Sequence, residues 1–412
     1  MWRIVHLNTA DNEGGAARAA YRLHKGLRSL GLDSKILSMY KVTQDSNAQT
    51  VYGNKYYKLA DRMTYPVLEW VGLQDLFYPS TLRLLRNEWI KQADIIQLHN
   101  LHGRYFSFPF LRLLEKKPLV WYLHDMWPIT GHCFYSYECT RWRDHCGDCP
   151  QWRNDYLPLK YDTTSIHHKL KVHTYKKLNL SIVAPSKWLY QVAKESKAFS
   201  IFRAAHIPYG IDCDFFFPID KKSCKTMLGV DASKVCVLFS AHVLENNTRK
   251  GGTYFLSALQ ELGEEFKKDL VVMFMGANYP SSQEMPPIDS KYIGYVTNDY
   301  LLRIVLSAAD VFVMPSLADN LPVSIMESMA CGTPTVAFNV GGIPDLVRHM
   351  DTGYLARYKD ASDLASGLKL ILKDEWLRQA MGRRCREVIE SEFSVALQAE
   401  RFRELYEAVL GK

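Results

Sequence analysis

At 412 residues the chain is longer than a single hydrophobic core usually supports, so its length predicts two domains of roughly 200 residues and excludes a single small module. Hydrophobic residues make up 47% of the sequence and charged residues 23%, as in ordinary globular proteins. No stretch approaches the roughly 18 to 20 uninterrupted apolar residues of a membrane-spanning helix, so we expect a soluble protein.

The charge is divided unevenly along the chain. Residues 1–210 carry 29 Lys and Arg against 17 Asp and Glu, a net charge of +12, whereas residues 211–412 carry 22 against 27, or −5. A basic half attracts anionic partners at long range, such as phospholipid head groups or a pyrophosphate-linked substrate. Lysines that only keep the protein soluble would explain the same excess. Nucleic acid is not an expected partner, because the basic residues form no aromatic-interleaved motif.

The N-terminal segment MWRIVHLN alternates apolar and polar residues and leads into a Gly-rich turn. This pattern predicts a first β-strand and not a secretion signal, so we expect the protein to remain in the cytoplasm. Apolar or β-branched runs then alternate with longer helix-forming segments, which predicts a parallel sheet. The predicted strands of this half are Arg3–Asn8, Ser34–Met39, Ile95–His99, Leu119–His124 and Ile182–Pro185.

The densest basic cluster of the first half is predicted to lie on one of its helices. It consists of Lys169, Lys171, Lys176 and Lys177, interleaved with apolar residues. A few lysines on one face suffice for reversible attachment to an anionic membrane surface, so this cluster is the candidate for peripheral binding. A solvated helix face is the competing explanation.

A second βαβ series follows, separated from the first by the Pro- and Gly-containing connection 206–212. Its predicted strands are Val235–His242, Leu270–Gly276, Tyr292–Tyr295, Val311–Met314 and Thr335–Phe338. We therefore expect an N-terminal domain over residues 1–208 and a C-terminal domain over 209–390. Residues 391–412 have helical apolar spacing and are predicted to form a terminal helix that returns to the N-terminal domain.

The strongest pattern lies within residues 309–342, where a strand, a polar loop, a helix and a second strand follow one another. Pro322 stands where a helix tolerates proline, and Gly332 suits the helix end. The backbone amides of Asn320, Leu321 and the first helical turn are predicted to receive an anion. An ordinary helix capped by Asp319 is the simpler reading, but it does not explain the whole series.

This segment resembles the family 4 retaining glycosyltransferases of bacterial polysaccharide biosynthesis. The family signature is E-x7-E, and the matching residues here are Asp319 and Glu327, with Asp in place of the first Glu. The resemblance implies that the first carboxylate contacts the hydroxyls of the donor sugar and the second grips the nucleotide ribose. It also implies the GT-B fold, in which two Rossmann-like parallel-sheet domains face each other across a cleft.

Three further segments match the family. Arg249 and Lys250 precede two glycines and a helix, where two cations offset the charge that grows on a departing diphosphate. Gly14 and Gly15 open the first helix and are similar to the family's glycine loop, which implies close approach of the backbone to the donor. His124 follows a strand and matches the family's histidine near the transferred sugar, although a buried structural histidine is the alternative.

Four of the nine cysteines cluster within seventeen residues, as Cys133, Cys139, Cys146 and Cys149, inside the segment 131–151. Their spacing could close a four-thiolate zinc site, which would be structural because it leaves no open coordination position. Packed thiols or two disulfides are the alternatives. The remaining five cysteines are scattered singly, which argues against a secreted disulfide framework.

Together these patterns predict a retaining glycosyltransferase that moves a sugar from a nucleotide diphosphate donor to a glycan or lipid-linked oligosaccharide acceptor. We expect no catalytic cofactor, with zinc only as a structural ion. The alternatives are a nucleotide-sugar epimerase of the same architecture and a binding protein without activity. The sequence does not specify the donor base, the sugar or the acceptor.

Overall fold

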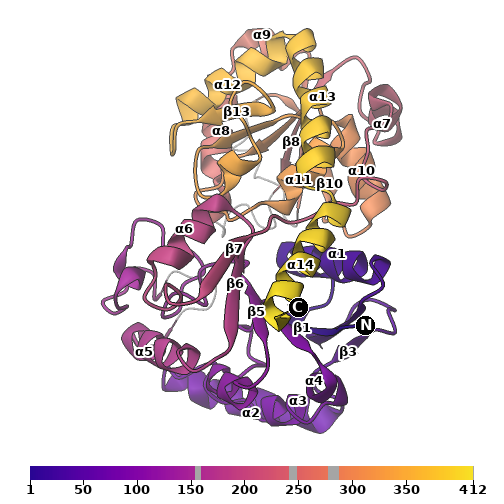
Figure 1. Cartoon of the computed structure of the whole chain (residues 1–412). Coiled ribbons are helices and arrows are strands. Elements are labelled where there is room, and N and C mark those ends of the chain that lie inside the picture. Colours follow the sequence, from indigo (N-terminus) through magenta and orange to yellow (C-terminus); the bar gives the residue numbers. More distant parts are fainter. Residues whose placement is uncertain (154–158, 241–247, 277–286, 412) are drawn as a thin grey trace. The chain divides into compact units, whose positions relative to one another are not determined.

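The computed structural model describes residues 1–153, 159–240, 248–276 and 287–411. The chain forms two compact units, which are coloured along the sequence in Figure 1. The first unit comprises Met1–Gly210 with Val395–Lys412, and the second comprises Ile211–Ser394. The sequence had placed the two boundaries after residues 208 and 390, a few residues from these positions.

The first unit is built on a parallel sheet with the strand order β3-β2-β1-β4-β5-β6-β7. Its strands are β1 (Arg3–Ala10), β2 (Asp33–Tyr40), β3 (Ala48–Thr50), β4 (Ile95–Leu98), β5 (Leu119–Tyr122), β6 (Leu180–Ala184) and β7 (Arg203–His206). The order moves outward in both directions from β1, as in doubly wound folds, and such sheets bind ligands at the carboxyl ends of their strands.

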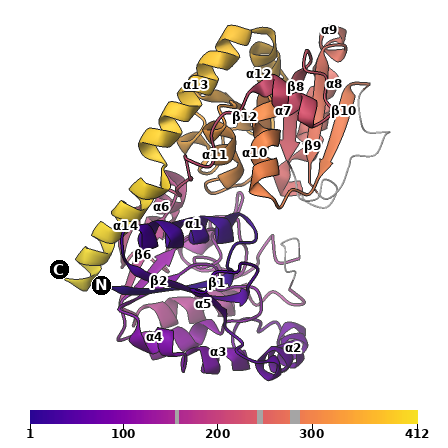
Figure 2. The ribbon, with the colours of Figure 1, turned by 90° about the vertical axis from the view of Figure 1, so that its right-hand side faces the viewer.

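Helices cover both faces of this sheet, with α1 and α14 on one face and α3, α4 and α5 on the other (Figure 2). The helices of the unit are α1 (Gly15–Ser29), α2 (Lys55–Trp70), α3 (Pro79–Leu84), α4 (Glu88–Gln92), α5 (Thr164–Tyr175), α6 (Lys187–Glu195) and α14 (Val395–Leu410). No helix among the described residues is both long and apolar enough to cross a membrane.

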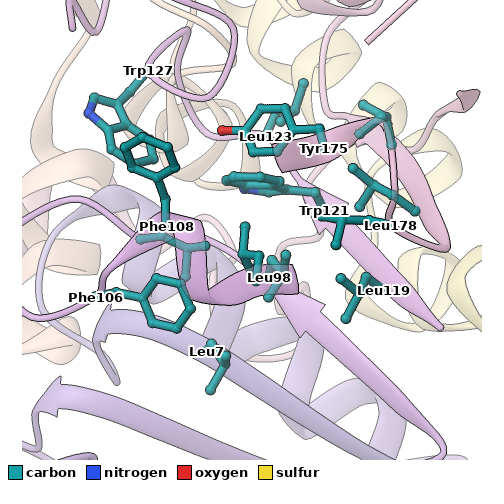
Figure 3. Packing of buried hydrophobic residues seen from close by; sticks show 14 of the residues in the cluster. Leu7, Leu98, Phe106, Phe108, Leu119, Trp121, Leu123, Trp127, Tyr175 and Leu178 are labelled. Carbon is teal, nitrogen blue, oxygen red and sulfur yellow. The ribbon is translucent and has the colours of Figure 1, made fainter. Parts of the chain in front are cut away.

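The core of the first unit is centred on Trp121 of β5, which is fully buried (Figure 3). Its ring meets Tyr175 of α5 edge-on, with 5.3 Å between the ring centroids, and Phe199 in the same way at 5.8 Å. The indole Nε1–H donates to the carbonyl oxygen of His99 at 3.0 Å. The apolar core thereby also fixes the turn that follows β4.

The second unit contains a parallel sheet with the order β10-β9-β8-β11-β12-β13. Its strands are β8 (Val235–Ser240), β9 (Leu270–Met275), β10 (Asp289–Gly294), β11 (Val311–Met314), β12 (Thr335–Phe338) and β13 (Gly353–Ala356). Its helices are α7 (Lys221–Met227), α8 (Gly252–Glu261), α9 (Glu264–Lys267), α10 (Asp299–Ala308), α11 (Val323–Ala330), α12 (Ala361–Lys373) and α13 (Glu375–Glu392).

The predicted pair of parallel-sheet, Rossmann-like domains is confirmed, and all ten predicted strands are present. The sequence missed β3, β7 and β13, which all lie at the edge of a sheet. Central parallel strands are covered on both faces, so their sequences are continuous runs of apolar residues. Short edge strands are less covered and need no such run. The predicted end of β8 at His242 lies outside the described residues.

The terminal helix α14 packs on the first unit. Gln398 Nε2 donates to the hydroxyl oxygen of Tyr122 at 3.0 Å, and the Tyr406 hydroxyl donates to Gln97 Oε1 at 2.9 Å. Gly26 of α1 allows the helices to approach closely, because a Cβ atom at that position would lie 3.0 Å from Ala399 Cβ. Two buried polar contacts therefore specify where the apolar face of α14 sits.

The predicted basic cluster, which lies on α5 and just beyond its end, is wrong in one of its members. Lys171 is fully buried, and its Nζ donates to the carbonyl oxygens of Trp127 at 2.6 Å and Thr130 at 3.1 Å. The ammonium also lies 3.6 Å from the centre of the Trp127 ring, and burial lowers the pKa of Lys171. Lys171 therefore anchors the loop after β5, and only the other three lysines are exposed.

We expect Tyr406→Phe to lower the free energy of unfolding by about 1 to 3 kcal/mol, because it leaves the buried Gln97 Oε1 without its donor. Tyr175→Phe is the matched control, since Tyr175 is equally buried and its hydroxyl has no hydrogen-bond partner among the described residues. Urea unfolding of both variants measures the difference. A loss for Tyr175→Phe as large as that for Tyr406→Phe would contradict the role of the Gln97 contact.

Candidate functional site

The predicted signature segment lies where β11 ends and α11 begins. Asp319 and Asn320 are buried in the loop between these elements, and Glu327 is buried on α11. The helix begins after Pro322, and Gly332 follows it with φ +73°, as the sequence predicted. The segment therefore forms a packed loop and helix at the carboxyl end of a parallel strand.

The structure brings the predicted cations onto the predicted carboxylate. Lys250 Nζ lies 2.8 Å from Asp319 Oδ2, and Arg249 Nη1 donates to the same oxygen at 3.1 Å. Arg249 Nη1 also donates to the carbonyl oxygen of Ala318 at 2.9 Å. Because β8 and β11 are neighbours in the sheet, the segments that follow them meet at one edge. Residues chosen from two separate segments of the sequence form one cluster.

Two glycines allow this loop to pack closely. Gly251 has φ +69°, and a Cβ atom there would lie 1.9 Å from the carbonyl oxygen of Pro315. Gly341 has φ +58°, and its Cβ would lie 2.0 Å from the carbonyl oxygen of Asp319. Any larger side chain would push the backbone of the loop away, so both positions require glycine.

The charges of the cluster stabilise one another. Burial raises the pKa of Asp319, but the neighbouring Lys250 and Arg249 outweigh burial, and the net shift of the pKa is downward. Burial lowers the pKa of Lys250, and Asp319 opposes this. Asp319 is therefore an anion that compensates the charges of Lys250 and Arg249.

One expectation about the loop is corrected. The amide of Asn320 was predicted to be available for an anion, but it donates to Asp319 Oδ1 at 3.1 Å. The short Asp side chain folds back onto the next residue of its own loop. This amide becomes available only when the Asp319 carboxylate moves.

The predicted His124 belongs to a row of buried histidines in the first unit. His99 Nδ1 lies 2.8 Å from His124 Nε2, and His99 Nε2 lies 2.9 Å from His6 Nδ1. The Ser34 hydroxyl extends the row, since its Oγ lies 3.0 Å from His6 Nε2 and 2.8 Å from His24 Nδ1. The row begins with His24 on α1 and crosses the neighbouring strands β2 and β1 at Ser34 and His6. It continues through the segments that follow β4 and β5, which carry His99 and His124.

Both ends of the row are fixed by other groups. His24 Nε2 lies 3.3 Å from Asp45 Oδ2, and His124 Nδ1 lies 2.7 Å from the Tyr209 hydroxyl. Burial raises the pKa of Asp45, but hydrogen bonds from the backbone and side chain of Asn47 and the nearby His24 outweigh it, so the carboxyl is ionised. An ionised carboxylate only accepts hydrogen bonds, so we assign the proton on His24 to Nε2.

This assignment propagates along the whole row. His24 Nδ1 must accept from Ser34, whose oxygen then accepts from His6 Nε2–H. By the same alternation His99 and His124 carry their protons on Nε2, and Tyr209 donates to His124 Nδ1. One carboxylate therefore sets the tautomer of His124, and both ring nitrogens of His124 are engaged within the protein.

The row is electrically neutral. Burial, the largest cause, lowers the pKa of His24 to about 4 and that of His124 to about 3, and it lowers the pKa of His6 and His99 well below the usual value. The sequence analysis singled out His124 but missed its connection to His99. The signal was a histidine in or directly after three strands that prove to be adjacent, β1, β4 and β5.

Gly14 and Gly15 open α1, as predicted. Gly14 has φ +85° and precedes the helix, and apart from the chain neighbours no atom of the described residues lies within 4 Å of a Cβ built at either glycine. Nearby, Asp11 accepts the backbone N–H groups of Val42 at 2.8 Å and Thr43 at 3.1 Å, and so fixes the loop. The glycine turn is therefore an open backbone surface on a firmly held loop.

The four clustered cysteines line one cavity, and none forms a disulfide. Cys146 Sγ accepts the backbone N–H of Gly131 at 3.2 Å, and burial raises the pKa of Cys146 to about 11. Four thiols match zinc in chemistry. Among the described residues, however, no three His, Cys, Asp or Glu side chains are arranged to hold a metal ion. The arrangement gives the zinc site no support, and the site stays a prediction.

Each of the two units matches a model of a known protein family. Residues 13–215 match the model described as Glycosyltransferase Family 4, and residues 234–374 match the model described as Glycosyl transferases group 1. The chain belongs to the family 4 glycosyltransferases. The second match contains Arg249, Lys250, Asp319 and Glu327, the residues that the signature had selected.

Sequence relatives agree with this membership. N-acetyl-alpha-D-glucosaminyl L-malate synthase of Bacillus anthracis is 34% identical over 26% of this chain and 28% of its own length. Alpha-maltose-1-phosphate synthase of Mycolicibacterium smegmatis is 30% identical over 48% of this chain and 55% of its own. The chain thus matches only about a quarter to a half of these relatives. A protein of Escherichia coli K12 named for colanic acid biosynthesis, WcaC, is 25% identical over 81% of this chain and 82% of its own.

Solved structures share the fold over the whole chain. Sucrose-phosphate synthase of Thermosynechococcus elongatus superposes with a TM-score of 0.72 at 18% identity and covers 99% of both chains. HepE of Anabaena, in a complex with UDP and glucose, has a TM-score of 0.69 at 15% identity and covers 99% of this chain and 100% of its own. At 18% and 15% identity, these two structures show only that the chain shares their fold.

The histidine row predicts acid sensitivity. A histidine whose pKa is depressed by folding binds a proton more readily when unfolded, so its stabilising contribution is complete above about pH 6.5 and is lost as the pH falls below that value. We expect the free energy of unfolding to fall by about 1.4 kcal/mol per pH unit for each such histidine until its folded pKa is reached.

Urea unfolding between about pH 7.5 and about pH 5 tests this expectation. His24→Gln should reduce the slope, because glutamine can still bridge Ser34 and Asp45 but takes up no proton. His173→Gln, at an exposed position of α5, should leave the slope unchanged. A slope that neither substitution alters would contradict the assignment of acid sensitivity to the row.

The zinc prediction is tested on Cys146. If the four cysteines hold zinc, protein purified without chelator contains about one zinc per chain, and Cys146→Ser loses both the metal and much of its thermal stability. Elemental analysis and thiol titration of the same sample provide the measurement. Absence of zinc together with four titratable thiols at these positions would refute the prediction and leave Cys146 as a packed thiol.

Proposed function

We propose that this chain transfers a sugar from a nucleotide diphosphate donor to a glycan or lipid-linked oligosaccharide acceptor, with retention of the anomeric configuration, in polysaccharide biosynthesis. The observation that carries the proposal is the cluster of Arg249 and Lys250 around the buried Asp319. It lies at the carboxyl ends of parallel strands, in the unit that matches the group 1 glycosyl transferase model.

The cluster suits a ligand that carries both phosphates and hydroxyl groups. A diphosphate would compete with the Asp319 carboxylate for the two cations, because Asp319 Oδ2 already lies 2.8 Å from Lys250 Nζ and 3.1 Å from Arg249 Nη1. Once released, the carboxylate becomes an acceptor for sugar hydroxyls, and the Asn320 amide loses its internal partner. One exchange of contacts would thus expose sites for both ends of the donor.

The same cations serve the reaction. When the bond between sugar and diphosphate breaks, negative charge grows on the departing phosphate oxygen, and positioned cations stabilise it. Two cations held beside the leaving group make a catalytic metal unnecessary in this proposal. No cofactor is therefore assigned to the reaction.

The other predicted residues take supporting roles. Glu327 is proposed to accept the ribose hydroxyls, as the family signature implies. Gly14 and Gly15 offer backbone close to the donor, and His124 is proposed to contact the transferred sugar. Because His124 Nδ1 is bonded to Tyr209 at 2.7 Å, a contact through this nitrogen requires the Tyr209 hydroxyl to move.

The comparisons support the choice of substrates. HepE, which shares the fold, was solved with UDP and with UDP-glucose, so uridine diphosphate sugars are the first donors to test. The Escherichia coli relative WcaC is named for colanic acid biosynthesis. A Campylobacter jejuni relative is named for a diphospho-undecaprenol-linked sugar. Both support a polysaccharide or lipid-linked acceptor.

Release of nucleoside diphosphate, measured for a panel of sugar donors with and without acceptor extract, tests the function. We expect release that depends on both one donor and the acceptor. Conversion of the donor sugar without any acceptor would instead identify an epimerase. Binding of the donor with neither release nor conversion would identify a protein without activity.

Substitutions of Asp319 and Glu327 should have opposite effects on UDP affinity. Asp319→Asn removes the internal competitor of the diphosphate, so we expect UDP to bind roughly three- to tenfold more tightly, about 0.7 to 1.4 kcal/mol, while sugar transfer falls. Asp351→Asn is the control for charge, since Asp351 pairs with Arg384 at 3.1 Å in the same unit. Weaker UDP binding by Asp319→Asn would show that this carboxylate helps to hold the nucleotide.

Glu327→Ala should weaken UDP binding by about tenfold or more, because it removes the proposed acceptor of the ribose hydroxyls. Glu327→Gln keeps one acceptor oxygen and should fall between Glu327→Ala and the unmodified protein. Calorimetry with UDP measures all variants under one condition. Unchanged affinity of Glu327→Ala would remove the ribose assignment and leave the proposal for Asp319 intact.

A further inference from the structure

The outer face of α2 is apolar along its whole length, although it faces solvent. Five of its residues are more than half exposed, with exposed fractions of 69%, 56%, 69%, 62% and 62%. In chain order they are Tyr56, Leu59, Met63, Val67 and Trp70. Their spacing of three and four residues places them on one side of the helix. We refer to these five residues as the α2 stripe.

The opposite face of α2 carries the polar contacts that fix the orientation of the helix. Asp61 is buried, and its Oδ1 accepts the backbone N–H of Ser80 at 3.0 Å. The Arg104 guanidinium lies 3.6 Å from the centre of the Tyr65 ring. A surface helix normally turns its apolar side inward and its charged side outward. Here the contacts of Asp61 and Tyr65 keep the apolar side outward.

The exposed charges that α2 itself carries are positive. Lys55, Lys58 and Arg62 of α2 are exposed, and Lys160 Nζ lies 5.0 Å from the centre of the Trp70 ring. The two carboxylates of the helix do not offset them, because Asp61 is buried and Glu69 lies 3.5 Å from Arg104. The surface thus combines an apolar stripe with a basic border and aromatic residues at both ends.

We propose that the α2 stripe docks on an anionic phospholipid bilayer. A helix with apolar residues on one side and lysines or arginines beside them binds in the head-group region of such a membrane, where aromatic residues such as Trp and Tyr are favoured. Anionic lipid complements the basic border. A second copy of the chain would instead bring two basic borders together, so charge disfavours the stripe as a dimer contact.

This surface differs from the lysine cluster that the sequence suggested. That cluster loses Lys171 to the core and contains no apolar stripe of exposed residues, whereas α2 carries both kinds of side chain. The inference does not depend on the proposed function. It would locate the proposed reaction at the membrane, because an enzyme docked there meets lipid-linked acceptors directly.

Co-sedimentation with vesicles of phosphatidylcholine alone, and of phosphatidylcholine with phosphatidylglycerol, tests the proposal on the whole chain. We expect binding to the anionic vesicles that falls as salt increases, and at least about a tenfold loss of binding in Met63→Gln with Val67→Gln. Met227→Gln is the matched control, since Met227 of α7 is 69% exposed, like Met63. Lys58→Gln with Arg62→Gln should weaken binding to anionic vesicles, whereas Lys169→Gln with Lys176→Gln should not.

Three results would overturn the proposal. The first is no binding to either kind of vesicle, and the second is an equal loss of binding in Met227→Gln and in the stripe variant. The third is a dimer, seen by sedimentation without lipid, that dissociates in Met63→Gln with Val67→Gln, because it would show a second copy on the stripe. Circular dichroism of each variant verifies that the exposed substitutions leave the fold intact.

Discussion

The site depends on one constraint, which is that every strand pair among the described residues is parallel. Parallel strands bring their carboxyl ends to one edge of a sheet, so the segments that follow them meet even when they are far apart in sequence. In the second unit this brings Lys250, after β8, onto Asp319, after β11. In the first unit it aligns His99, after β4, with His124, after β5. The chemistry of both units therefore follows from strand direction and strand order.

One carboxylate organises each of these groups, the buried Asp319 in the second unit and the partly buried Asp45 in the first. Asp319 holds two cations that would otherwise repel each other, and it keeps both in place where we propose that the diphosphate binds. Asp45 fixes the direction of hydrogen bonding through the histidine row and so the tautomer of His124. Both arrangements place charge or protons in a defined state before any ligand arrives. Such preorganisation is what electrostatic catalysis requires, because no reorganisation is left for the moment of reaction.

The sequence predicted the fold class and the central strands, since strands buried on both faces must be apolar and so leave a clear pattern. It also selected Arg249, Lys250 and Asp319, but it did not predict that they pair with one another. That pairing depends on the neighbouring position of β8 and β11, which no local pattern encodes. The burial of Lys171 and the outward face of α2 were missed for a related reason. A lysine or a leucine at helical spacing shows the periodicity of a helix, but the packing of the whole unit decides which side turns inward.

The central claim is that the nucleoside diphosphate part of the donor binds at the Asp319 cluster of the second unit. A crystal structure of the protein with UDP tests it most directly. The account predicts the diphosphate within hydrogen-bond distance of Arg249 and Lys250, the ribose at Glu327, and the Asp319 carboxylate released from at least one of its cations. UDP bound elsewhere, or bound with the contacts of Asp319 to both cations unchanged, would contradict it.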